Sequence, residues 1–96
     1  MLRSTVLKSL KEFKDLHAKK YGILVLGVFG STARNEATPT SDVDIVLQTL
    51  TPDPYVLVHI KEDLEKMFNK QVDIVRLRER MNPFLKNQIE KDAHYV

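Results

Sequence analysis

The stretch Gly27–Ile45, GVFGSTARNEATPTSDVDI, decides the fold of this chain. An apolar run ends there in Gly30 and Ser31, and a second apolar run opens with two acids, Asp42 and Asp44. Alternate side chains of a strand share one face, so the two aspartates point the same way while the apolar residues between and after them point into the core. The sequence therefore predicts a pair of carboxylates at the start of a buried strand.

Outward from this stretch, the pattern predicts alternating helices and strands. Apolar residues at steps of three and four indicate helices, short branched runs indicate strands, and the pairs Asp53-Pro54 and Asn82-Pro83 are typical helix starts. The expected order is a helix over residues 4–20, a strand over 23–29, a short helix over 31–36, a strand over 43–47, a helix from Pro54 to about residue 69, a strand over 71–76 and a last helix after Pro83. We therefore expect an α/β (α+β) fold in which helices cover a small sheet of about three strands, as a single domain over residues 1–96.

The composition excludes several classes of protein. Fifteen basic and thirteen acidic side chains give a formal charge of +2, too small a surplus to indicate nucleic-acid binding. There is no cysteine, which excludes disulfides and thiolate metal sites and suits a cytoplasmic protein. No apolar run approaches the ~20 residues that a membrane span needs. We expect a cytoplasmic protein with no membrane partner.

A third acid stands in a similar setting. Asp73 lies inside the apolar run VDIV, and if its strand neighbours the one that carries Asp42 and Asp44, the three carboxylates share a face. Such oxygen ligands suit Mg²⁺ or Mn²⁺, which can align a phosphoryl or nucleotidyl displacement, and the third acid can accept a proton from the attacking hydroxyl. The alternative is that these are ordinary strand-end acids facing solvent.

A possible phosphate seat precedes the acids. Gly30 and Ser31 follow a strand and precede a short helix, where unpaired backbone N–H groups face outward. Gly30 has no side chain to obstruct a phosphate, Ser31 can donate its hydroxyl, and Arg34, one turn on, can reach the same phosphates. The alternative is an ordinary serine cap followed by a solvated arginine. The segment is not a Walker A loop, because it lacks the Gly-Lys-Ser/Thr ending.

Residues 30–45, GSTARNEATPTSDVDI, resemble the signature of the DNA polymerase β-like nucleotidyltransferase superfamily, and are similar above all to its minimal nucleotidyltransferases. The signature consists of Gly-Ser, ten intervening residues, and Asp-x-Asp. With Asp73 as the third carboxylate, the resemblance runs from about Val25 to Arg76. It implies a mixed-sheet palm, ATP or another nucleoside triphosphate as donor, and two Mg²⁺ ions, with Mn²⁺ as a substitute.

The resemblance also assigns residues and a partner. By motif, Gly30 and Ser31 would hold the triphosphate, Asp42 and Asp44 would bind metal, and Asp73 would complete the metal site. Many minimal members are antitoxins encoded beside a helical ribonuclease toxin of the HEPN family, and some transfer AMP to a tyrosine of that toxin. The resemblance thus implies transfer of a nucleoside monophosphate to a partner protein, with a partner or a second subunit supplying the acceptor.

Two other functions stay open from the sequence. One is a non-enzymatic antitoxin that neutralises its partner by binding alone. The other is a nucleic-acid binder that uses residues 76–80, RLRER, although no aromatic residue interleaves these arginines to stack on bases.

Three positions depart from the family pattern. Asn35 stands where glycine is frequent, Thr38 where arginine is frequent, and Thr40 where an acid is frequent. Asparagine tolerates the left-handed backbone better than most residues, so we expect the turn at Asn35 to be kept. The two threonines affect the expected contacts around the metal site rather than the metal ligands themselves.

Overall fold

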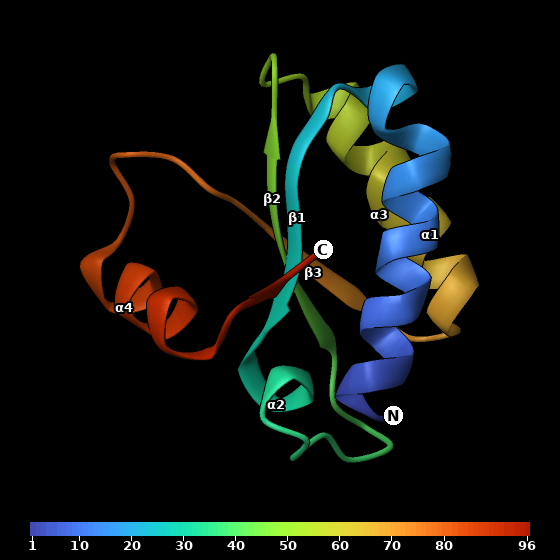
Figure 1. The fold of residues 1–96 in the computed structure, drawn as a ribbon. Helices are drawn as coiled ribbons and strands as arrows, with labels where there is room; N and C mark the ends of the chain where they lie inside the picture. Colours follow the sequence, from blue (N-terminus) through green and yellow to red (C-terminus); the bar gives the residue numbers. More distant parts are fainter.

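The structure, a computed structural model, describes all 96 residues and confirms an α+β fold (Figure 1). Helices α1 and α3 lie on one face of the sheet and α4 on the other, with α2 at one end. No helix has both the length and the apolar character required to cross a lipid bilayer. The elements are α1 (Arg3–Tyr21), β1 (Ile23–Phe29), α2 (Gly30–Ala33), β2 (Val43–Thr49), α3 (Pro54–Phe68), β3 (Val72–Arg76), α4 (Pro83–Asp92) and β4 (His94–Tyr95).

Capping residues set the helix ends where the sequence predicted them. Gly22 ends α1 in the left-handed conformation, with φ of 65°. The Asp53 carboxylate accepts a hydrogen bond from the backbone N–H of Tyr55 at 2.9 Å, and Asn82 Oδ1 accepts one from Phe84 at 2.9 Å. A proline follows each of these two caps, where its missing N–H costs no helical hydrogen bond. The starts of α3 and α4 are therefore fixed locally.

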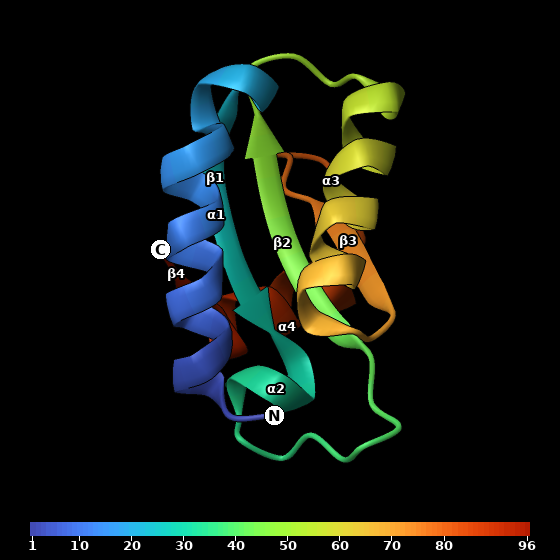
Figure 2. The same cartoon turned by 90° about the vertical axis from the view of Figure 1, so that its right-hand side faces the viewer.

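The sheet is mixed, in the order β3-β2-β1-β4. Strand β1 is antiparallel to both β2 and β4, whereas β2 and β3 are parallel. Parallel neighbours need a crossover connection, and α3 supplies it. Figure 2 shows α3 and α1 next to each other over the same face of the sheet. This crossover brings the beginnings of β2 and β3 to the same end of the sheet.

The two faces of the sheet bury different amounts of apolar surface. Residues of β2 alternate, so that Val43, Ile45 and Leu47 enter a cluster of 14 buried residues under α1 and α3. On the other face, Val46 packs with Phe29 of β1 and Ile89 of α4 in a cluster of only three buried residues. Most of the core therefore lies under α1 and α3, and the α4 face stays open beyond its small cluster.

The sequence-based expectation of about three strands was wrong by one. His94 and Tyr95 form β4, in which Tyr95 pairs with Gly27 of β1, and the N–H of Val96 donates to the carbonyl of Leu26 at 2.9 Å. A Cβ atom at Gly27 would lie 2.6 Å from the carbonyl oxygen of His94 and 2.8 Å from Cδ1 of Tyr95. Strand β4 can therefore reach β1 only because position 27 is glycine.

Candidate active site

The structure brings the three predicted acids to one end of the sheet. Asp44 of β2 pairs in parallel register with Asp73 of β3, and residues in register share a face. Asp42 lies one residue before β2, and its charge is near enough to raise the pKa of Asp44. On its other side Asp44 pairs with Phe29, the residue before α2. The predicted proximity of the two strands is confirmed, and the acids lie beside the strand-to-helix junction.

The negative charge of these acids is not balanced by a cation. None of the three takes part in an ion pair in the structure. The pKa of Asp44 is raised above its ordinary value, first by burial and then by the neighbouring charges of Asp73 and Asp42, with Arg34 acting weakly in the opposite direction. Mutually repelling carboxylates of this kind are stabilised by a bound cation.

The donor set matches the metal that the family pattern implies. Carboxylate oxygens are the ligands that Mg²⁺ and Mn²⁺ prefer. In the structure, no three Asp, Glu or His side chains lie close enough together to coordinate a metal ion. The residues thus fit such an ion by their chemistry and shared face, and binding one requires their side chains to turn toward each other.

Replacement of Asp44 is expected to change how stability depends on pH. Because the pKa of Asp44 is raised in the folded state, the folded chain binds a proton at this carboxylate more tightly than the unfolded chain does. The contribution of Asp44 to the free energy of unfolding therefore falls as pH rises from about 4, the ordinary pKa of aspartate. In the presence of a chelator, Asp44→Asn should therefore gain Tm relative to the wild type as pH rises toward neutrality. Thermal melts across this range measure the difference. Tm curves of the two proteins that run parallel across pH would contradict this prediction. Added Mg²⁺ should reduce the difference in Tm between them, because it stabilises only the wild type.

Gly30 occupies a position that no other residue fits without strain. Its φ is 71°, in the left-handed region, and a Cβ atom there would overlap with Oδ2 of Asp44. The sequence predicted that the missing side chain leaves space for a phosphate; in the structure it leaves space for the Asp44 carboxylate. Helix α2 begins at this residue and covers only residues 30–33, shorter than the predicted 31–36. The position of the Asp44 side chain thus requires glycine at position 30.

Gly30→Ala is expected to reduce Tm by about 5–15 °C, because an alanine in the left-handed region costs about 1–2 kcal/mol in a domain of this size. It should also displace Asp44 and so weaken binding of Mg²⁺ at the acids. The matched control is Gly22→Ala, where φ is also positive at 65° but an added Cβ meets Leu50 at an ordinary 3.5 Å. Thermal melts and Mg²⁺ titrations of both variants separate the effects: an equal loss of Mg²⁺ affinity in both would contradict the role of Gly30 in placing Asp44.

The loop between the glycine and the acids is held in place by a lysine of the α3–β3 connection. Lys70 donates to the carbonyl oxygens of Thr38 at 3.1 Å and of Pro39 and Ser41 at 3.3 Å each. Within the loop, Thr38 N–H donates to the Ser41 hydroxyl at 2.9 Å, and the hydroxyls of Thr38 and Thr40 are 3.2 Å apart. The two threonines that depart from the family pattern therefore close this loop on itself.

Asn35, the other departure, keeps the turn as expected. Its φ is 58°, so asparagine adopts the left-handed conformation here. Its side-chain oxygen also accepts a hydrogen bond from the backbone N–H of Arg3 at 2.8 Å, at the start of α1. An asparagine at this position thus joins the site segment to the first helix, which glycine cannot do.

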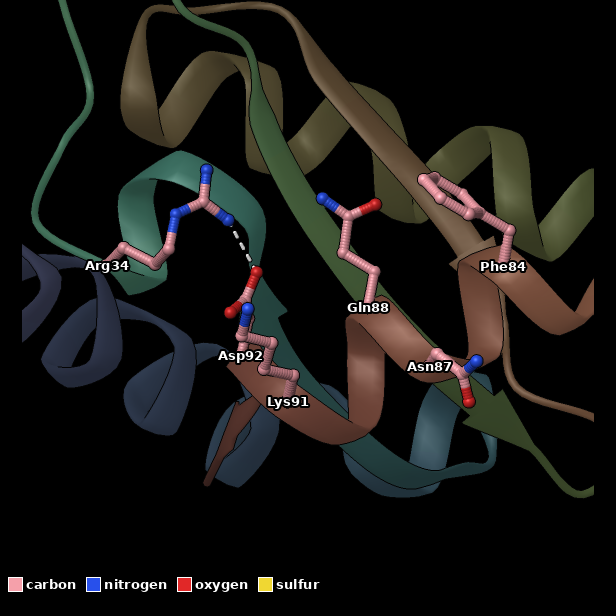
Figure 3. A pocket seen from close by; sticks show the side chains of 6 residues that line it. All are labelled: Arg34, Phe84, Asn87, Gln88, Lys91 and Asp92. Carbon is pink, nitrogen blue, oxygen red and sulfur yellow. Dashed lines mark hydrogen bonds and ion pairs between the residues drawn. The ribbon is translucent and has the colours of Figure 1, made fainter.

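Ser31 and Arg34 differ in how far the chain itself occupies them. The Ser31 side chain is half-buried and makes no hydrogen bond in the structure, so its hydroxyl is free for a ligand. Arg34 donates from Nε to Glu36 at 3.0 Å and from Nη1 to Asp92 at 2.5 Å (Figure 3). The arginine expected to contact phosphates is thus held in place by two carboxylates, with part of its guanidinium left free.

Asp92 is a site residue that the sequence interpretation missed. Its side chain is only 6% exposed, and Arg34 is its ion-pair partner. It lies three residues after Ile89 and seven after Leu85, both on the face of α4 that packs against the sheet. An acid in register with apolar residues of a helix indicates a buried pair, and this was the signal available in the sequence.

Comparison with known proteins agrees with these features. The family model described as "Polymerase beta, Nucleotidyltransferase" matches residues 11–96. A candidate protein adenylyltransferase of Methanocaldococcus jannaschii is 36% identical over 98 residues, which span 94% of this chain and all of that protein. The protein adenylyltransferase MntA of Thermococcus cleftensis is 32% identical over 90 residues, which span 88% of this chain and 86% of that one.

Solved structures show the same fold. A candidate minimal nucleotidyltransferase superposes with a TM-score of 0.80 at 28% identity over 100% of this chain and 97% of that one. A toxin-antitoxin structure with AMP-PNP gives 0.69 at 22% identity, over 90% and 72% of the chains. A Shewanella oneidensis complex of a tri-AMPylated HEPN toxin with an MNT antitoxin gives 0.57 at 18%, over 88% and 70%. By its family match and its relatives, this chain belongs to the polymerase β nucleotidyltransferase family.

Proposed function

We propose that this nucleotidyltransferase transfers AMP from ATP, with Mg²⁺, to a partner protein that is a toxin of the HEPN family. The observation that supports metal-dependent nucleotidyl transfer is the set of three carboxylates without a balancing cation. Two of them, Asp44 and Asp73, lie in register beside Gly30. A purely structural module gains nothing from a cluster of carboxylates that repel each other. A site for a metal-bound triphosphate needs such a cluster to hold the metal.

In this reaction an acceptor hydroxyl attacks the α-phosphorus of ATP, the bond to the β-phosphate oxygen breaks, and pyrophosphate leaves. Bound Mg²⁺ would supply neutralisation of the charge on the triphosphate. Asp42 and Asp44 would hold the metal, and the free hydroxyl of Ser31 would donate to a phosphate oxygen. Asp73, which is exposed, would complete the metal site and accept the proton of the acceptor hydroxyl.

The nature of the acceptor is supported by the relatives. The two relatives described above carry names that assign protein adenylyltransferase activity, and two of the structures described above come from toxin-antitoxin complexes. The exposure of Asp73 on the outermost strand also suits an acceptor that comes from another protein rather than from within this chain.

The test is incubation of the chain with each α-labelled nucleoside triphosphate and Mg²⁺, with and without a HEPN protein encoded next to it. We expect label from ATP on the HEPN protein, lost when a chelator is added. Label on no protein would contradict the proposal. If the double variant Asp42→Asn/Asp44→Asn neutralises the toxin as well as the wild type does, neutralisation rests on binding alone, which is the non-enzymatic alternative.

A further inference from the structure

A hollow of about 370 Å³ lies between Arg34, at the end of α2, and one side of α4 (Figure 3). Its volume falls within the range of about 300–1,000 Å³ that is usual for small-molecule sites. Five of its six lining residues are polar or charged, and they include both cationic and amide groups. The residues around it are Arg34, Phe84, Asn87, Gln88, Lys91 and Asp92.

The α4 residues of the hollow lie along one strip of the helix. Phe84, Gln88 and Lys91 follow each other at steps of four and three, which places them on the same side, and Asn87 borders that side. None of the amide or ammonium groups makes a hydrogen bond within the chain, and the Phe84 ring is 80% exposed. In Figure 3 the Gln88 amide stands between the guanidinium of Arg34 and the ring of Phe84. A stacking surface and unpaired amide groups thus adjoin a cationic side chain.

Arg34 connects this hollow to the expected phosphate seat. Its backbone N–H donates to the carbonyl of Gly30 at 3.2 Å, so it lies one turn from the glycine against which Asp44 packs. Its side chain reaches across to α4, where the bond to Asp92 fixes the guanidinium at the edge of the hollow. Arg34 thus belongs both to the turn that starts at Gly30 and to the lining of the hollow, which places the hollow next to the expected phosphate seat.

We propose that the hollow between α2 and α4 binds the nucleoside of the donor nucleotide, with the base against Phe84 and its edge hydrogen-bonded by Gln88. Aromatic rings stack on any base, and a side-chain amide offers the donor and acceptor that match the adjacent amino group and ring nitrogen of adenine. This inference rests on the proposed function, because it presumes a nucleoside triphosphate at the acids. It assigns the base selection to α4.

The experiment measures the affinity of the chain for ATP, for the other three nucleoside triphosphates and for inorganic tripolyphosphate, each with Mg²⁺. The variant is Phe84→Ala/Gln88→Ala, which removes an exposed ring and a half-buried amide. We expect it to lose at least about tenfold in affinity for ATP, and its preference among the bases, while its affinity for tripolyphosphate stays within about twofold. The matched control is Lys86→Ala/Glu90→Ala, two exposed residues of α4 outside the hollow, which should bind ATP as the wild type does.

Three results would overturn the inference. The first is unchanged ATP affinity in the variant, which would leave the hollow to an acceptor or to solvent. The second is an equal loss for ATP and tripolyphosphate, which would mean that the change acts on the phosphates. The third is a wild type that binds tripolyphosphate as tightly as ATP. If the wild type binds no nucleotide at all, the proposed function fails together with the inference. If one of the three results is obtained with a wild type that transfers AMP, only the inference fails.

Discussion

Asp44→Asn is expected to reduce nucleotidyl transfer about a thousandfold while the chain stays folded. Asparagine keeps the shape of the side chain but removes the charge that would hold the metal, and metal stabilisation of the developing phosphate charge contributes several kcal/mol, of which about 4 kcal/mol corresponds to a thousandfold in rate. The same loss is expected for Asp42→Asn. The measurement is the initial rate of label transfer to the partner at saturating ATP and Mg²⁺.

The control for these variants is Asp15→Asn. Asp15 is an exposed acid of α1 that pairs only with Lys11, one turn away at 3.6 Å, so its loss removes the same charge without touching the site. Transfer by this variant should equal that of the wild type. Because burial and the neighbouring acids already raise the pKa of Asp44, its neutral replacement is not expected to unfold the chain. Wild-type rates in Asp44→Asn would therefore refute a metal site at this end of the sheet.

Arg34→Ala is expected to have the largest effect on stability. It leaves the carboxylate of Asp92 buried, with its side chain only 6% exposed, and without its ion-pair partner. Loss of one partner of a buried pair is strongly destabilising, and since the Arg34 side chain is itself 37% exposed we expect only part of that effect. For a domain of this size that lowers Tm by about 10–20 °C, measured by thermal or urea unfolding.

Two further variants test whether the buried charge is the cause. Glu36→Ala removes the other partner of Arg34, which is 65% exposed, and should change the free energy of unfolding by less than about 0.5 kcal/mol. Arg34→Met/Asp92→Leu removes both charges of the pair and should recover most of the stability lost in Arg34→Ala. No recovery in the double variant would show that the packing of the arginine stem, rather than the pairing of Asp92, explains the loss.

Local signals in the sequence predicted most of the fold and the three acids of the site. Caps such as Asn82, each followed by proline, fix where helices begin whatever surrounds them. The alternation around Asp44 gave the face of its strand. The sequence left it conditional that the strand of Asp73 is its neighbour, and the βαβ connection meets that condition by bringing the beginnings of the two strands together.

What the sequence did not reveal depends on contacts between distant residues. Strand β4 has only two residues, too few for a periodic pattern, and it forms because Gly27, 68 positions before Tyr95, has no side chain. The pairing of Arg34 with Asp92 spans 58 positions, so the apolar register of Asp92 in α4 can indicate a buried acid but not which residue pairs with it. Such partners become visible only when the packing of α4 against the sheet is known.

The position of β3 as the outermost strand has a consequence for how the protein behaves in concentrated solution. A free strand edge can pair with a strand of another molecule and so begin aggregation, and charged side chains on that strand oppose it. Asp73 is exposed at the second position of this five-residue strand, between the apolar residues Val72 and Ile74. The carboxylate that we assign to the metal site therefore also keeps the edge of the sheet soluble, and an apolar replacement there would remove both properties together.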